Sequence, residues 1–235
     1  MDSLYIVMPA YNEEANIETT IKQWYPLIAD KAESSRLVVA DSGSSDRTHF
    51  LLEKLQAAYP KLEILSDTGR FHGPKVMALY KYAIEKKADY IFQTDSDGQT
   101  DPAEFSAFWE ERDGYDALIG NRNVRGDGAD RAFVEKVVCL LVFLIFGVRV
   151  PDANAPFRLM KGSLVAKYID RLPADYELPN IMMTVYFAFY KEKLKFNVIS
   201  FKPRQGGKNS LNIPRIVGIG IKAIKDFAAL KKAMH

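Results

Sequence analysis

The feature that most restricts the fold is an alternation of short apolar runs with longer segments of helical periodicity. Five runs have the length and β-rich composition of strands: LYIVM (4–8), RLVVA (36–40), LEIL (62–65), DYIFQT (89–94) and DALIG (116–120). The segments between them with helical spacing cover 14–32, 47–59, 74–87 and 102–112. Strand–helix–strand units at this spacing predict a parallel α/β sheet with helices on both faces.

The second half of the chain is less regular. It predicts strands in FRLMK (157–161) and LKFNVISFKP (194–203), and helices over 131–147, 162–171, 177–192 and from about Pro214. With 235 residues, of which 48% are hydrophobic, the chain is long enough for one substantial core. We find no repeat, low-complexity tract or linker. We therefore expect one domain over 1–211 and a C-terminal amphipathic helix over 212–235.

A polar loop follows each of the first four strands. These loops are PAYNEE (9–14), DSGSSD (41–46), DTGRFHGPK (67–75) and DSDGQTDP (95–102). Each alone is equally well explained as an ordinary surface turn. Because ligands of parallel sheets bind beyond the carboxyl ends of the strands, the four loops together predict a binding site at one edge.

The fourth loop, FQTDSDGQTDPAEF (92–105), has two interpretations. It is nearly a calcium-binding EF-hand loop, but such a loop needs flanking helices and an acid at its first position, where this chain has Gln93 after a strand. The alternative is an Asp-x-Asp at a strand end, where Asp95 and Asp97 share a face. Oxygen donors from Asp97 and Gln99 would leave open positions on Mg²⁺ or Mn²⁺ bridging a diphosphate. We favour this second interpretation.

The loops also carry a family resemblance. MPAYNEEANI (8–17), VVADSGSSDRT (38–48) and QTDSDGQTDP (93–102) resemble, in order and spacing, the inverting family 2 glycosyltransferases of the GT-A fold. The branch with dolichyl-phosphate mannose synthase and bacterial polyprenyl-phosphate sugar transferases is the most similar. The resemblance continues through GNRNVRGDGADR, DANAPFRLMKGSL and KPRQGGKNS to about Leu211. It implies a Rossmann-like nucleotide-binding sheet. No P-loop or G-x-G-x-x-G occurs, which disfavours a kinase or a dehydrogenase.

The resemblance implies a donor site for a nucleoside-diphosphate sugar. The matching positions are Pro9, Tyr11, Glu13, Asp41, Lys75, Asp95, Ser96, Arg204 and Lys208. Pro9, Tyr11 and Glu13 would lie against the nucleoside, and the Asp41 carboxylate would accept a ring N–H of guanine or uracil. Ser42 stands where the family usually has a second acid, which leaves the base open. Lys75, near the start of a helix, would lie near phosphate, although a surface lysine is an alternative.

The resemblance also implies a cation and a set of catalytic residues. Asp95, Asp97 and Gln99 match the metal positions, and Mn²⁺ or Mg²⁺ there would act as a Lewis acid on the departing diphosphate. The catalytic candidates are Asp97, Arg122, Arg131 and Glu177. Arg122, Arg131 and Arg204 match positions near the sugar nucleotide or the acceptor phosphate, which guanidinium groups bind well.

The acceptor determines whether a general base is needed. The resemblance favours a polyprenyl phosphate such as dolichyl or undecaprenyl phosphate, and a phosphomonoester with a pKa of about 6 attacks without one. For a hydroxyl acceptor in polysaccharide or glycolipid synthesis, Glu177 or Asp152 would be the base. Ala155 and Pro156 replace the family's usual Ser-Gly, which puts the substrate's identity in doubt. A calcium-binding module and a non-catalytic nucleotide-sugar binder remain alternatives of other classes.

Composition limits the partners and the compartment. A net charge of +2 gives no bulk electrostatic case for nucleic acid, and the single Cys139 excludes an internal disulfide and fits a reducing compartment. The N-terminus has no secretory signal pattern, and the longest apolar run, 137–146, falls short of the roughly 20 residues that cross a bilayer. We therefore expect a cytoplasmic protein, peripheral on the cytoplasmic face of a membrane.

Two segments are candidates for membrane contact, namely the apolar run 133–148 and the basic amphipathic segment 213–234. Burial in the core or in a dimer interface is the alternative for the first, and an ordinary packed helix for the second. A partner protein could also supply the anchor, and a homo-oligomer is a further possible assembly.

Overall fold

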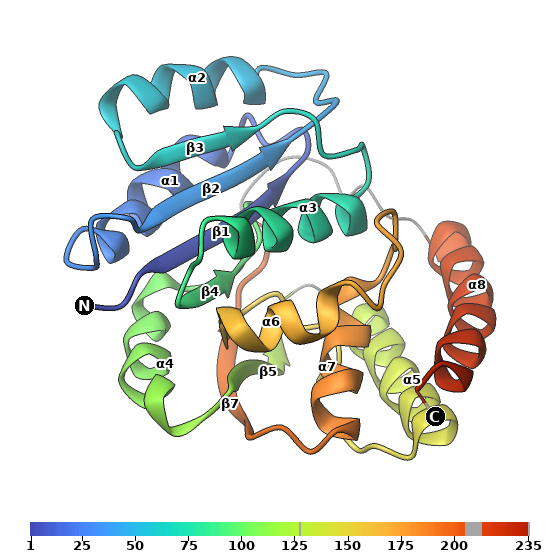
Figure 1. Cartoon of the computed structure of the whole chain (residues 1–235). Helices are drawn as coiled ribbons and strands as arrows, with labels where there is room; N and C mark the ends of the chain where they lie inside the picture. The colour runs from blue at the N-terminus through green and yellow to red at the C-terminus, as the bar shows by residue number, and fades with distance from the viewer. Residues whose placement is uncertain (127, 205–212, 235) are drawn as a thin grey trace.

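A seven-stranded sheet forms the centre of the protein in this computed structural model, which describes residues 1–126, 128–204 and 213–234 (Figure 1). The strand order is β3-β2-β1-β4-β6-β5-β7. The strands are β1 (Leu4–Ala10), β2 (Arg36–Asp41), β3 (Leu62–Leu65), β4 (Tyr90–Gln93), β5 (Ala117–Arg125), β6 (Arg158–Lys161) and β7 (Leu194–Phe201). Every expected strand is present, and the α/β prediction is confirmed.

The direction of β6 is the main feature that periodicity did not reveal. Strands β1 to β4 pair in parallel, whereas β6 runs antiparallel to both of its neighbours, β4 and β5. The sheet is therefore mixed, because an apolar pattern specifies a strand but not its direction. The reversal places the start of β6, at Arg158, at the same edge as the carboxyl ends of β1, β2 and β4.

Helices cover both faces of this sheet. They are α1 (Ile17–Trp24), α2 (Thr48–Ala58), α3 (His72–Glu85), α4 (Phe105–Glu111), α5 (Ala129–Phe146), α6 (Gly162–Ile169), α7 (Pro179–Phe189) and α8 (Ile213–Lys232), with 3-10 turns at Tyr25–Ile28, Pro102–Glu104 and Arg112–Gly114. The helix expected over 14–32 is shorter than predicted. It changes to a 3-10 turn that contains Pro26, whose missing N–H cannot continue the α-helical hydrogen bonds.

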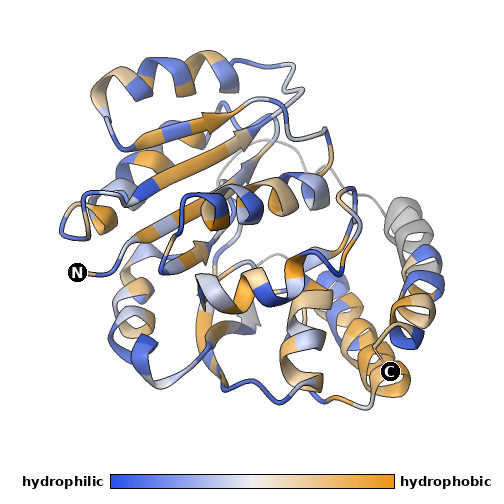
Figure 2. Ribbon diagram, viewed as in Figure 1, coloured by the Kyte–Doolittle hydropathy of each residue, from blue (hydrophilic) through white to orange (hydrophobic). Residues whose placement is uncertain are grey.

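Two hydrophobic cores lie on opposite faces of the sheet, and β1 contributes to both. Leu4, Ile6 and Met8 pack with α1, α2 and α4, while Tyr5 and Val7 pack with the group that includes α3, α6 and α7. Figure 2 shows the resulting apolar colouring of the central strands. All seven residues of β1 are buried, as expected for a strand covered on both faces.

Helix α8 lies against α5 at the edge of the molecule (Figure 1). The rings of Phe227 and Phe146 are 5.7 Å apart, and Phe227 and Ala223 are buried while Lys225 is exposed. The described part of this C-terminal segment is thus an amphipathic helix. Within the described residues, no helix combines the length and apolarity needed to cross a membrane.

Gly73 fixes the packing of α3 against the segment before α7. A Cβ at Gly73 would lie 2.3 Å from the Tyr176 carbonyl oxygen and 2.5 Å from the Glu177 Cα. We expect Gly73→Ala to lower the free energy of unfolding by about 2 kcal/mol, because the backbone must move to admit the methyl group. Gly114→Ala is the control, since its Cβ meets nothing within 4 Å. Urea unfolding measures both, and equal midpoints for the two variants would contradict this packing.

Candidate active site

The polar loops converge at the carboxyl edge of the sheet as predicted. In the register of the sheet, Ala10 at the end of β1 pairs with Asp41 at the end of β2. The Ser96 hydroxyl, from the loop after β4, donates to the Pro9 carbonyl at 2.8 Å. The Asn12 backbone N–H donates to the Ser44 hydroxyl at 3.0 Å. These contacts join the loops that follow β1, β2 and β4.

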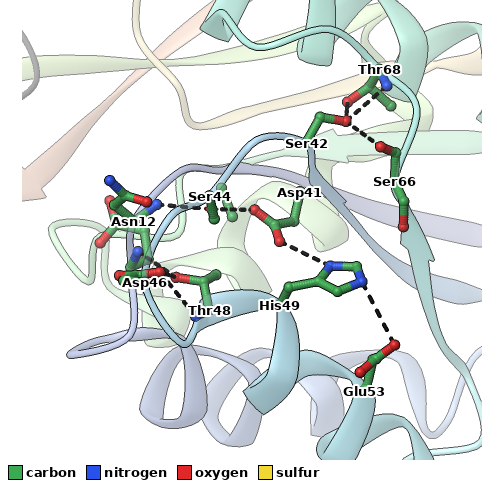
Figure 3. Close-up of polar contacts among 12 residues, drawn as sticks. Asn12, Asp41, Ser42, Ser44, Asp46, Thr48, His49, Glu53, Ser66 and Thr68 are labelled. Carbon is green, nitrogen blue, oxygen red and sulfur yellow. Dashed lines mark hydrogen bonds and ion pairs between the residues drawn. The ribbon is translucent and has the colours of Figure 1, made fainter.

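The predicted base-reading residue, Asp41, lies at the end of β2 in a chain of polar contacts (Figure 3). One carboxylate oxygen accepts from the Ser44 hydroxyl, and the other lies 3.1 Å from Nδ1 of His49. Nε2 of His49 lies 3.7 Å from Glu53. His49 and Glu53 were not among the predicted site residues. Their spacing on α2, at positions i and i+4 in the helix that follows Asp41, was the available signal.

Ser42, which stands next to Asp41, contacts the segment that follows β3. Its hydroxyl donates to the Ser66 carbonyl at 2.6 Å and lies 3.0 Å from the Thr68 hydroxyl (Figure 3). The side chain therefore ties the end of β2 to the loop after β3 and does not extend the negative charge of Asp41.

Lys75 is not a surface residue. It is buried in the first turns of α3, where its Nζ donates to the Ala10 carbonyl and lies 5.2 Å from the centre of the Tyr11 ring. Burial lowers the pKa of Lys75 to about 8, although the charge of Asp41 acts against the shift. Arg70 covers the same tyrosine and donates to its hydroxyl at 3.1 Å. Two cationic groups thus gather around Tyr11.

Glu13, Asp97 and Arg204 meet from three distant parts of the chain. Arg204 follows β7, and its guanidinium lies 2.5 Å from a Glu13 oxygen and 3.6 Å from Asp97 Oδ2. Burial, and then the neighbouring Asp95 carboxylate, raise the pKa of Asp97 to about 7. Burial also raises the pKa of Glu13. Two carboxylates therefore contact one arginine, and Asp95 adds a third negative charge near Asp97. This local excess of negative charge favours a further cation.

The predicted metal-binding residues lie together in the loop after β4. The Asp97 carboxylate accepts from the Gln99 backbone N–H at 3.1 Å, and the Gln99 side-chain amide donates to the Lys202 carbonyl at 2.8 Å. Asp95 lies 3.4 Å from Nε2 of His72. In the part of the chain that the structure describes, no group of three His, Cys, Asp or Glu side chains is arranged to hold a metal ion by itself. These residues fit an open site for Mg²⁺ or Mn²⁺, which take one or two carboxylates plus substrate phosphates.

Arg122 lies in a second cluster with two carboxylates. Its Nε and Nη2 donate to the two oxygens of Asp152 at 2.7 and 2.8 Å, and Nη2 lies 3.2 Å from Glu135. Burial acts to raise the pKa of Asp152, but the hydrogen bonds and charge of Arg122 outweigh it and lower that pKa. Burial and Asp152 raise the pKa of Glu135. Glu135 was not among the predicted site residues, because it stands inside an apolar run.

The remaining predicted residues are Arg131, Glu177 and Lys208. Arg131 is half-buried in the first turn of α5, one turn before Glu135. Glu177 precedes α7 and forms an ion pair of 2.9 Å with Lys222 of α8. Lys208 lies outside the described residues.

Arg158 holds the turn before β6. It is fully buried, and its guanidinium donates to the carbonyl oxygens of Ala155 and Asn180. The Asn180 side chain in turn donates to Gln93 Oε1 at 2.9 Å, at the end of β4. This buried network supports the strand end that carries Asp95.

The family follows from comparison with known proteins. The family model described as glycosyl transferase family 2 matches residues 5–161. The chain belongs to this family. It is 26% identical over 166 residues to undecaprenyl-phosphate 4-deoxy-4-formamido-L-arabinose transferase of Pseudomonas aeruginosa, covering 70% of this chain and 49% of the relative. An uncharacterized glycosyltransferase of Synechocystis is 23% identical over 229 residues, which cover 97% of this chain and 70% of the relative.

The fold of this family 2 chain is similar to solved glycosyltransferase structures. Glucosyl-3-phosphoglycerate synthase from Mycobacterium tuberculosis, in complex with Mn²⁺, uridine diphosphate and phosphoglyceric acid, superimposes with a TM-score of 0.71 at 17% identity. The match covers 98% of this chain and 78% of the synthase. The GT-A prediction is thereby confirmed. The chain spans about half the length of the Pseudomonas relative that it matches.

The raised pKa of Asp97 predicts a stability gain on neutralisation. The folded state holds the proton up to about pH 7, whereas an unfolded Asp loses it near pH 4. As the pH rises, the unfolded state is therefore stabilised by ionisation before the folded state is. The free energy of unfolding falls between about pH 4 and pH 7, and the loss is complete above pH 7. In EDTA we expect Asp97→Asn to be more stable than the parent by about 2 kcal/mol at pH 8, and by less at pH 5. Urea unfolding measures this, and a less stable variant at pH 8 would contradict it.

In the Arg122 cluster, by contrast, we expect the loss of a carboxylate to lower the stability of the protein. Asp152→Ala leaves a buried guanidinium without its two-point partner, so we expect a loss of about 3 kcal/mol in the free energy of unfolding. Glu18→Gln is the control, because its ion pair with Lys22, at 3.9 Å, is exposed and contributes roughly 0.5 kcal/mol or less. Chemical denaturation of both variants gives the comparison. A loss no larger than that of the control would mean that Asp152 does not stabilise Arg122.

Proposed function

We propose that this chain is a metal-dependent inverting glycosyltransferase that moves a sugar from a nucleoside-diphosphate sugar to a polyprenyl phosphate, at the cytoplasmic face of a membrane. The observation that carries the proposal is the meeting of Glu13, Asp97 and Arg204 at the carboxyl edge of the sheet. A family 2 chain with acids and an arginine at this place has the groups that a sugar diphosphate and a divalent cation require.

The donor half of the site follows from the positions of its side chains. Asp41 offers a buried carboxylate to a ring N–H of the base, and Lys75 provides a cation under Tyr11. Mg²⁺ or Mn²⁺ held by Asp97 and Gln99, beside Asp95, would act as a Lewis acid on the departing diphosphate. Arg204 lies within reach of the same phosphates because it already contacts Asp97.

The contacts of the two candidate bases bear on the kind of acceptor. Asp152 is bound at both oxygens by Arg122 and its pKa is lowered, so it is a weak proton acceptor. Glu177 is paired with Lys222. An ionised phosphate needs neither residue, because its oxygen attacks without losing a proton. This supports a phosphate acceptor over a hydroxyl one. The name of the Pseudomonas relative, an undecaprenyl-phosphate transferase, agrees with this choice.

The structure disfavours the EF-hand alternative for the loop after β4. Strand β4 precedes this loop and a 3-10 turn at Pro102–Glu104 follows it, so the helix that an EF-hand needs on its N-terminal side is replaced by a strand. A non-catalytic sugar-nucleotide binder differs from the proposed enzyme only in turnover. Turnover is therefore the deciding measurement.

A donor panel tests the proposal. UDP- and GDP-sugars are incubated with the protein and Mn²⁺ or Mg²⁺, with a short-chain polyprenyl phosphate, with a glycolipid hydroxyl acceptor, or with neither. We expect sugar transfer only when a divalent cation and the polyprenyl phosphate are both present. Transfer to the hydroxyl acceptor alone, or donor binding without any transfer, would contradict the proposal.

Two substitutions separate the donor and acceptor roles. We expect Asp97→Ala to abolish metal-dependent turnover while the circular dichroism spectrum stays unchanged. We expect Arg131→Ala to raise the KM for polyprenyl phosphate about tenfold with little change in the KM for the donor, because it removes one charge-assisted contact. Arg171→Ala is the matched control. Arg171 lies just after α6, is exposed, and donates a hydrogen bond to the Tyr190 hydroxyl. Parent-like kinetics of Arg131→Ala would remove its acceptor role.

A further inference from the structure

Helix α5 presents a row of apolar side chains to solvent. Phe133, Val137, Leu140 and Leu144 are 68%, 38%, 55% and 67% exposed. At 3.6 residues per turn and 1.5 Å per residue, the four lie within an arc of about 60° and along about 16 Å of the helix. We name these four residues the α5 stripe. The opposite side of the helix, with Val142 and Phe146, is buried in the core. A continuous exposed apolar surface of this kind marks an interaction site.

We propose that the α5 stripe is the surface by which this protein docks on a lipid bilayer that contains anionic lipids. The inference rests on the proposed function in one respect, namely that a polyprenyl acceptor keeps its tail in a membrane. It deepens that function by assigning the membrane contact to four residues on one helix.

The stripe begins next to the candidate active site. Helix α5 follows β5, whose Arg122 contacts Glu135 on the helix, and Phe133 is only two residues from Glu135. A bilayer in contact with the stripe would therefore lie close to the edge of the sheet where the acceptor phosphate must react. The lipid tail can remain in the membrane while the phosphate reaches the site.

The charges near the stripe suit an anionic membrane. Lys136 is exposed beside it, and Arg149, just beyond the end of α5, stacks 4.7 Å from the Phe143 ring. An apolar face with lysine and arginine at its borders is typical of helices that lie in the membrane interface. Asp130, one turn before Phe133, marks the end of the stripe.

A second copy of the chain fits the stripe less well. The stripe residues are spaced by four, three and four positions, as in coiled coils, but in coiled coils the flanking positions pair opposite charges. Here the flanking residues are Val134, Lys136, Leu141 and Phe143, which provide a positive charge and no negative one. A two-fold interface would place like charges around the same apolar strip. The lipid surface is therefore the better occupant.

Vesicle flotation of the full chain tests the proposal. The vesicles contain phosphatidylcholine with or without a third of phosphatidylglycerol, and no donor, metal or acceptor is added. We expect the parent to float with the anionic vesicles and the double variant Phe133→Ser, Leu144→Ser to bind about tenfold more weakly. Lys136→Glu should weaken binding to anionic vesicles. Phe50→Ser is the matched control, because Phe50 is 55% exposed on α2, on the other side of the sheet, and should bind like the parent.

Failure of the parent to bind, or equal binding by parent and double variant, would overturn the proposal. Circular dichroism checks the fold, and Leu140→Gln alone decides the matter if the double variant is misfolded. Sedimentation tests the competing explanation, that the stripe forms a dimer interface. A parent dimer that the double variant dissociates, without vesicle binding by either, would assign the stripe to a second copy. Because flotation uses no substrate, its failure leaves the proposed function standing, and absent turnover leaves vesicle binding standing.

Discussion

The partly buried carboxylate of Asp97 shapes the edge of the sheet on which the candidate site depends. It lies in the loop after β4 near Asp95 and Glu13, and like charges so close together cannot all ionise in a buried place without a cation. Arg204 supplies one positive charge by folding back after β7. One guanidinium against three carboxylates leaves an excess of negative charge. A divalent cation reduces this excess and at the same time provides a contact for diphosphate oxygens.

The reversed strand β6 separates the site into two centres of different character. Because β6 starts at the edge where β4 ends, the segment before β6 places Asp152 next to Arg122. Glu135 of α5 is the third member of this group. Here two carboxylates already surround a cation, and the shifts in their pKa values go in opposite directions. At this centre the Arg122 guanidinium is already engaged by both carboxylates. The Asp97 centre holds a larger excess of carboxylates over cations, which is why we assign the chemistry to it.

Sequence reasoning succeeded where a pattern maps directly onto geometry. Apolar runs gave the strands, and their order along the chain placed Asp41 and Asp97 at one edge. It failed where a property depends on packing between distant segments. The direction of β6, the burial of Lys75 and the engagement of Arg122 by Glu135 arise from such contacts, and no local spacing encodes them. The contact of Arg204 with Glu13 spans most of the chain, and family resemblance rather than periodicity drew attention to both residues.

Electron paramagnetic resonance of Mn²⁺ tests the central claim, that the edge beside Asp97 is a joint site for a cation and a diphosphate. Free Mn²⁺ is titrated with the parent protein alone, with UDP and with GDP, and each mixture is compared with the nucleotide alone. We predict weak binding by the protein by itself. One of the two nucleotides should raise the affinity for Mn²⁺ about tenfold beyond the nucleotide alone, since the diphosphate supplies the missing ligands. Binding of Mn²⁺ that neither nucleotide changes would contradict the account.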